Sequence, residues 1–185
     1  DSSNLGSYYV VESITDKTRL RFKWFLEPAK SYYKVKPLNY LSSLFGHEGK
    51  NSLFSTLVKD GLATELSAGP EHLTNIFSTF NISITLSEKG LKQIEEVSSR
   101  VMKFIKLIQS LPINKRYYEE IKIVSQISFD YKNREKPLEY CENLSYIMND
   151  YKEEDILSGP YIYETYDEGL IKKYLQDLTV DKMNV

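Results

Sequence analysis

The chain has 185 residues, of which 41% are hydrophobic and 27% are charged. A chain of this length buries about 70% of its unfolded surface when it folds as one globular domain, so it can form a core without disulfides or metals. The 24 basic and 26 acidic residues give a formal net charge of −2, which provides no electrostatic reason to expect nucleic-acid binding. We therefore predict a single domain over residues 1–185.

The cysteine count and the hydropathy of the sequence indicate the type of compartment and argue against a membrane-spanning segment. The single cysteine, Cys141, excludes an intrachain disulfide and favours the cytoplasm or another reducing compartment. No apolar run approaches the ~20 residues of a membrane-spanning helix, so we predict no membrane partner. The chain starts without Met and without a signal-like segment, and we expect it to be processed or cut from a longer protein.

The N-terminal region is predicted to form a β-hairpin. Two runs rich in β-branched and aromatic residues, Ser7–Ser13 and Thr18–Leu26, flank a polar turn at Ile14–Lys17. In the second run almost every other residue is apolar, which indicates a strand with one buried face.

Two short helices are predicted next. Pro37 suits the first turn of a helix, and apolar residues follow it at helical spacing as far as Phe45. Ser52 is a suitable N-cap for a second helix, which Gly61 ends.

The rest of the chain is predicted to contain two strands followed by four helices. The strands are Ala63–Ala68 and Phe80–Leu86, and the helices run from Ser87 to Pro112, from about Asn114, from Pro137, and from Tyr166 to Leu178. Strands followed by a run of helices are typical of an α+β fold, here an antiparallel sheet with helices packed on one face.

Two of these helices carry apolar residues that are predicted to face the core. They are Ile121, Val124 and Ile127 on the helix after Asn114, and Leu138, Cys141, Leu144 and Ile147 on the helix after Pro137. On this interpretation Cys141 is a buried, inert thiol rather than a nucleophile.

The segment from Tyr40 to Gly69 carries the most specific pattern. It joins a helix to the turn Gly46-His47-Glu48-Gly49, then adds a second short helix and a strand that ends in Leu66-Ser67-Ala68-Gly69. This ordered combination resembles the second domain of the insulinase-like, pitrilysin-type zinc metallopeptidases, in which a G-H-E-G turn and an L-x-x-G strand occur in the same order. The resemblance implies the LuxS/insulinase-like metallopeptidase domain fold for the whole chain. In that fold one more strand follows the last helix, and we expect most or all of it to be missing here.

The histidines argue against a metal site. A helical zinc site of this class needs two histidines with a glutamate between them as the base. His47-Glu48 resembles the start of such a motif, but Asn51 stands where the second histidine is required. The only other histidine, His72, is distant in the sequence.

The resemblance leads to the same expectation. It implies that the first domain of a parent enzyme carries H-x-x-E-H and the zinc, and that Asn39, Ser42 and Ser43 occupy the matching positions here. None of these three is a strong zinc ligand or a general base. We therefore predict a non-catalytic domain that holds no metal or cofactor and does not hydrolyse peptides by itself.

The G-H-E-G turn has a structural and a functional interpretation. It is either a helix C-cap with incidental polar residues or, as the resemblance implies, part of an exosite that holds the N-terminal part of a peptide substrate away from the zinc. The exosite positions, carried over residue by residue, are Gly46, Glu48, Leu66, Ser67 and Ala68. A strand edge offers backbone groups to a peptide, and a carboxylate accepts its terminal ammonium group.

This chain departs from the family pattern around the exosite. Lys50-Asn51 replaces the small residues that usually follow the turn, and Ala68 stands where glycine is common. Asn39 and Ser43 occupy positions that are histidine in some members of the family. These departures concern the affinity and selectivity of the exosite rather than its location.

The predicted role is therefore that of a chamber wall and exosite in a zinc metalloendopeptidase. Its predicted partners are peptide substrates and the other domains of the same polypeptide. The alternative is a structural relative that acts as a scaffold, such as a core subunit of the respiratory cytochrome complex or a processing-peptidase partner. A free-standing peptide-binding module is a further alternative.

Overall fold

The computed structural model describes residues 5–12 and 17–185. Its strands are β1 (Arg19–Leu26), β2 (Ala63–Leu73), β3 (Ser78–Leu86) and β4 (Met183–Asn184). Its α-helices are α1 (Pro37–Phe45), α2 (Leu53–Lys59), α3 (Glu88–Lys92), α4 (Ile94–Ser110), α5 (Lys115–Asp130), α6 (Pro137–Ile147) and α7 (Glu168–Gln176). Short 3-10 helices are η2 (Lys30–Tyr32), η3 (Glu153–Asp155) and η4 (Val180–Lys182).

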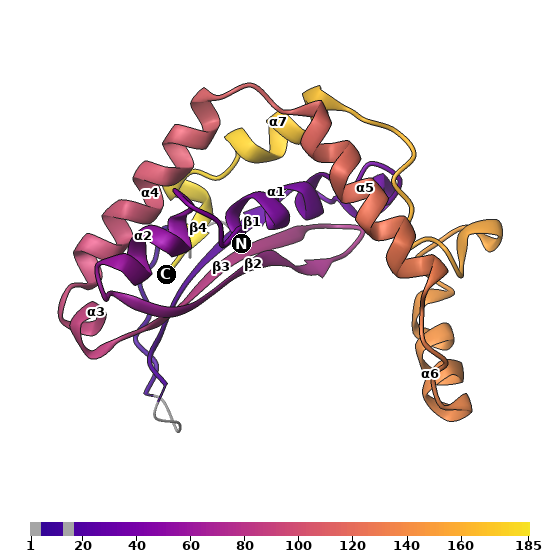
Figure 1. Cartoon of the computed structure of the whole chain (residues 1–185), viewed down its shortest axis with the longest axis horizontal. Coiled ribbons are helices and arrows are strands. Elements are labelled where there is room, and N and C mark those ends of the chain that lie inside the picture. The colour runs from indigo at the N-terminus through magenta and orange to yellow at the C-terminus, as the bar shows by residue number, and fades with distance from the viewer. Residues whose placement is uncertain (1–4, 13–16) are drawn as a thin grey trace.

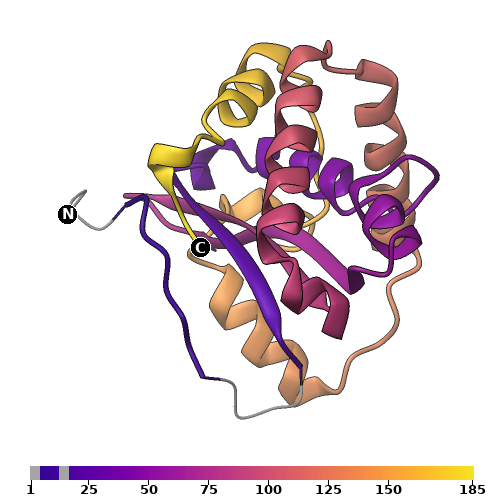
Figure 2. The ribbon, with the colours of Figure 1, turned by 90° about the vertical axis from the view of Figure 1, so that its left-hand side faces the viewer.

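The described strands form one antiparallel sheet in the order β2-β3-β1-β4. Helices α4, α5 and α7 arch over one face of this sheet, with α1 beneath them, and none of the described residues forms a helix layer on the opposite face (Figure 1). Helix α6 projects away from the arch, beyond the level of the sheet, in both ribbon views (Figures 1 and 2). The α+β prediction, with helices on one sheet face, is confirmed.

The core lies between the sheet and the arch of helices. Trp24 is completely buried, and its ring stacks on Phe22 with 6.2 Å between ring centroids. Its indole Nε1–H donates a hydrogen bond of 3.1 Å to the carbonyl oxygen of Thr179, so the polar atom of this side chain is satisfied inside the core. The alternation of apolar and polar residues in β1 thus places one face of the strand in the core, as predicted.

The long helix predicted after Ser87 is divided in two. Ser87 does cap it, because its hydroxyl accepts a 2.9 Å hydrogen bond from the Gly90 N–H. The helical path is interrupted at Gln93, whose φ of −127° lies outside the helical range, and α4 begins after it. A side chain at Gly90 would place its Cβ 1.9 Å from the carbonyl oxygen of Leu62, so α3 rests directly on the backbone that leads into β2.

The predicted N-terminal hairpin is wrong. Residues 7–12 form no strand, and the Tyr9 N–H bonds the Val185 carbonyl oxygen at 2.7 Å while the Val185 N–H bonds the Ser7 carbonyl oxygen at 2.9 Å. The expected partner edge of β1 is taken by β4, so the N-terminal segment lies along the far side of β4 instead. The predicted turn at 14–17 falls largely outside the described residues. The expected last strand is seen as the two residues of β4.

The predicted inward faces of α5 and α6 are also largely wrong. Val124 and Ile127 are 63% and 51% exposed, and only Ile121 of that set contacts the core. Cys141 is exposed rather than buried, and Leu138 is 71% exposed. The apolar pattern of these helices is real, but α6 extends away from the sheet (Figure 1). The outer part of α5 packs against the loop around Tyr161 and not against the core.

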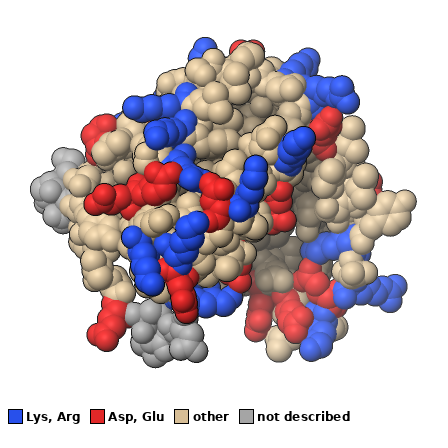
Figure 3. Space-filling model, turned by 60° about the vertical axis from the view of Figure 1, so that its left-hand side comes forward, with Lys and Arg blue, Asp and Glu red and all other residues tan. Residues whose placement is uncertain are grey.

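The surface carries charges of both signs. On the face shown in Figure 3, Lys and Arg side chains are interspersed with Asp and Glu, without a large region of one sign. Within the described residues, no helix is both long enough and apolar enough to cross a bilayer.

Candidate functional site: a groove between helix α1 and the edge of β2

The turn after α1 has local causes. The Gly46 N–H donates a 2.8 Å hydrogen bond to the Ser42 carbonyl oxygen, and a Cβ at this position would lie 2.9 Å from the same oxygen. Asn51 then adopts the left-handed conformation, with φ of 67°. The Ser52 hydroxyl accepts a 3.0 Å hydrogen bond from the Ser55 N–H and caps α2, as its position in the sequence predicted.

A glycine brings the chain back beside α1. Gly61, with φ of 68°, follows α2, and its N–H bonds the Val58 carbonyl oxygen at 2.9 Å. The Leu62 N–H bonds the Leu57 carbonyl oxygen at the same distance, which completes the C-terminal cap of the helix. Strand β2 therefore starts two residues after the turn and runs along α1.

These two turns place the predicted exosite residues around one open groove. It has a volume of about 470 Å³ and lies between the end of α1, the G-H-E-G turn and β2. Its lining includes all five predicted positions, Gly46, Glu48, Leu66, Ser67 and Ala68, and also Ser42, Ser43, His47 and Tyr117. Segments about twenty residues apart in the sequence, the turn at 46–49 and the strand at 66–69, thus share one surface.

One edge of β2 faces the groove. Because β2 is the outermost strand of the described sheet, its far edge has no strand neighbour. The Ser42 hydroxyl donates a 2.6 Å hydrogen bond to the Ala68 carbonyl oxygen, so this carbonyl points away from β3. Backbone groups alternate in direction along a strand, and those of Leu66 therefore face the same edge.

The carboxylate of Glu48 is available to a ligand. Glu48 is exposed and forms no ion pair or hydrogen bond with the described residues. It stands at the open end of the groove, beyond the last turn of α1. The groove thus combines one unpaired negative charge with a free strand edge.

Tyr117 belongs to the groove, although the exosite motif does not include it. It comes from the first turn of α5 and lines the groove together with Ser43. Its ring packs edge-to-face against Tyr40 at 5.5 Å, and burial raises the pKa of Tyr117. The doublet Tyr117-Tyr118 was visible in the sequence, but the position of α5 was needed to bring it here.

The residues at the expected zinc positions do not fit a zinc ion. The Ser42 hydroxyl is engaged with the Ala68 carbonyl, Ser43 offers only a neutral hydroxyl, and Asn39 offers only a neutral amide. Zinc sites of this kind need thiolate, imidazole or carboxylate ligands. Across the described residues, no group of three or more His, Cys, Asp or Glu side chains comes together.

Comparison with known proteins identifies the family of the chain. Residues 2–124 match the family model described as the peptidase M16 inactive domain, and residues 129–185 match the middle or third domain of peptidase M16. Human nardilysin is 35% identical over 189 aligned residues, which cover 100% of this chain and 16% of the relative. Human insulin-degrading enzyme is 28% identical over 182 aligned residues, which cover 98% of this chain and 18% of the relative.

The same fold occurs in a solved structure. The crystal structure of pitrilysin superposes with a TM-score of 0.92 at 23% identity, and the match covers 100% of this chain and 20% of pitrilysin. The chain thus spans about one sixth of the length of the nardilysins that it matches. It belongs to the peptidase M16 family, as an inactive domain of the insulinase-like proteases.

Proposed function

We propose that this chain is a single non-catalytic domain of a zinc metalloendopeptidase, in which it forms part of the chamber wall and an exosite for peptide N-termini. The zinc and the hydrolysis would belong to the first domain of the parent enzyme. The observation that carries the proposal is the groove that joins the unpaired Glu48 carboxylate to the free edge of β2.

The groove suits a peptide that adds a strand to the sheet. The backbone groups of Leu66 and the Ala68 carbonyl face the groove, where an extended peptide can pair with them. The Ala68 carbonyl already accepts from Ser42, but a carbonyl oxygen has two lone pairs and can accept a second hydrogen bond. Glu48 would then accept the terminal ammonium group at the end of the added strand.

The packing supports one domain rather than two. The stretches matched by the two family models meet within α5, yet both contribute to one hydrophobic core. Val101 from the first stretch is fully buried in that core together with Ile171 and Leu175 from the second. We therefore infer that residues 1–185 fold as one unit.

The test is a Glu48→Gln substitution in the full-length protein, assayed with long and short peptides. An exposed ion pair contributes about 0.2–1 kcal/mol, so KM for long peptides should rise by up to about fivefold. Peptides too short to reach from the zinc to the groove should be unaffected, and acetylation of the N-terminus of a long peptide should reproduce the effect of the substitution.

A matched control is Glu142→Gln, which removes an exposed carboxylate on the remote helix α6. It should leave KM unchanged for both peptide lengths. If Glu48→Gln altered short and long peptides equally, Glu48 would not anchor the substrate. The scaffold alternative would then be preferred if the parent also lacked peptidase activity.

A further inference from the structure

The uncovered face of the sheet carries a row of positive charges along β1. Because successive strand residues point to opposite faces, Arg19, Arg21 and Lys23 share this face while Phe22 and Trp24 are buried behind it. Lys17 precedes them with the same spacing. Four successive positions on one face are therefore basic.

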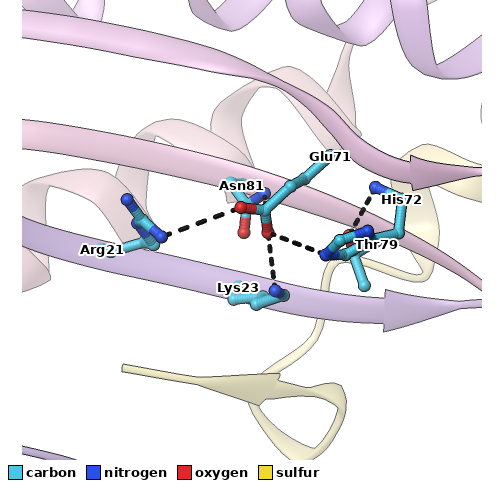
Figure 4. A network of polar contacts seen from close by, with 6 residues as sticks. All are labelled: Arg21, Lys23, Glu71, His72, Thr79 and Asn81. Atoms are coloured by element: carbon cyan, nitrogen blue, oxygen red, sulfur yellow. Dashed lines mark hydrogen bonds and ion pairs between the residues drawn. The ribbon is translucent and has the colours of Figure 1, made fainter.

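The two ends of this row are neutralised by carboxylates from β2. The Lys23 Nζ lies 2.6 Å from Glu71 Oε2, and Asn81 donates to the same carboxylate oxygen at 3.2 Å (Figure 4). The Lys17 Nζ lies 2.7 Å from Glu65 Oε1. The hydrogen bond from each lysine is the main reason that the pKa values of Glu71 and Glu65 are below their usual range.

The two middle positions are not neutralised in this way. The nearest carboxylate oxygen to the Arg21 guanidinium is Glu71 Oε1, 3.9 Å away, which is beyond hydrogen-bonding distance (Figure 4). Arg19 forms no ion pair or hydrogen bond with any described residue, and its charge acts on Glu65 only at longer range. Both arginines are exposed.

A hollow lies beside these two arginines. Its volume is about 430 Å³, and small residues from β2 and β3, namely Ser67, Gly69 and Ser83, form part of its lining. Glu65 and Glu71 line it as well, and each is paired with a lysine. The strand register places Ser83 between Arg21 on β1 and Ser67 on β2. Since no large side chain stands between them, the guanidinium of Arg21 has an open path across the sheet toward β2.

The hollow and the exosite groove share one strand. Leu66, Ser67 and Ala68 line both, the groove along the edge of β2 and the hollow across its face. A peptide strand added at that edge would direct every second side chain to the face that carries the arginines. The ligand of the hollow would therefore be a side chain of a peptide bound along β2.

We propose that Arg19 and Arg21 form a subsite that binds the carboxylate of an acidic side chain in a peptide held on β2. Guanidinium groups bind carboxylates through paired N–H donors. This suits Arg19, which pairs with no described residue, and Arg21, whose ion pair with Glu71 is long, at 3.9 Å. The inference rests on the proposed exosite and adds a substrate preference to it: peptides with Asp or Glu a few residues after a free N-terminus.

The experiment is an NMR titration of the chain with peptides of about ten residues that have free N-termini and a single Glu at successive positions, each paired with its Gln analogue. An exposed ion pair contributes about 0.2–1 kcal/mol, so the best Glu peptide should bind up to about fivefold more tightly than its Gln analogue. The Arg19 and Arg21 Nε–Hε signals should shift only with the Glu peptide. The preference should weaken at high salt.

Substitutions separate this subsite from the exosite. Arg19→Gln with Arg21→Gln should abolish the preference for Glu and leave the affinity for the Gln peptide unchanged. Arg134→Gln, which removes one exposed positive charge from a distant loop, should leave both the preference and the affinity unchanged, and it is the charge-matched control for Arg19→Gln alone. Glu48→Gln and N-terminal acetylation should weaken both peptides to the same degree.

Each proposal has its own failing result. Equal affinity of Glu and Gln peptides at every position would overturn the arginine subsite, even if acetylation still weakened binding. If acetylation and Glu48→Gln changed nothing while the Glu preference depended on the arginines, the exosite would fail and the subsite would remain. If no peptide bound, both would be overturned.

Discussion

Lys36 gives a prediction whose size follows from its surroundings. It is the N-cap residue of α1, only 7% exposed, and its ammonium group donates a 2.7 Å hydrogen bond to the Gly159 carbonyl oxygen. The ring centroids of Tyr151 and Tyr163 lie 6.0 and 5.7 Å from this ammonium group. Among the described residues, no carboxylate forms an ion pair with it. Burial of this charge lowers the pKa of Lys36 from 10.5 to about 8.

Because the pKa of Lys36 is lower in the folded state, the charged form of this residue destabilises the folded protein. One pKa unit corresponds to 1.36 kcal/mol, so the cost below pH 8 is about 3 kcal/mol. Between pH 8 and 10.5 the unfolded chain keeps the proton that the folded chain has lost. Stability therefore rises with pH across this window, and the Lys36 contribution should grow by about 2 kcal/mol between pH 7 and 9.5.

The assay is urea unfolding of the wild-type chain and of Lys36→Met at several pH values in that range. Methionine has a similar length and no charge, so the stability of the Lys36→Met variant lacks this contribution to the pH dependence. The free-energy difference between the two proteins, Met variant minus wild type, should fall by about 2 kcal/mol from pH 7 to 9.5. Tyrosines and other lysines titrate in both proteins and cancel. If the difference stayed constant with pH, the reasoning about a buried, unpaired charge would be refuted.

Two other predictions concern Gly90 in helix α3 and the metal. Gly90→Ala should destabilise the chain by about 1–3 kcal/mol, because its Cβ would overlap the Leu62 carbonyl oxygen. The control is Gly169→Ala in α7, where the added Cβ would meet nothing closer than 3.5 Å; it should be neutral or stabilise the chain by up to about 1 kcal/mol. Thermal or urea unfolding measures the stability of both variants. Equal effects of the two substitutions would contradict the steric argument. Elemental analysis after dialysis should find no stoichiometric zinc in the chain, and one tightly held ion per molecule would contradict this expectation.

The candidate groove was predictable because local signals determine its parts. Gly46 and Gly61 end two helices and Ser52 begins one, and each acts through neighbours within a few residues. These short-range effects fix the path from α1 to β2 almost completely. The same is true of β3, where alternate apolar residues give a strand with one buried face.

The sequence pattern did not show which apolar faces would be covered. Val124 and Leu138 lie on helices with the expected spacing, yet both are exposed, because a helical period describes which residues share a face but not what lies against that face. The N-terminal run likewise has strand-forming residues. Its partner was decided by β4, which takes the edge of β1.

The sequence by itself therefore determined the α+β class, the helix and strand boundaries set by glycine and serine, and the location of the G-H-E-G turn beside its strand. Only the tertiary structure decided that Tyr117 would complete the groove, that Arg19 would pair with no described residue, and that Arg21 would reach a carboxylate only at 3.9 Å. The physical reason is one of range. Caps and turns depend on residues a few positions apart, whereas these contacts join elements distant in the sequence, whose positions follow from how the whole core packs.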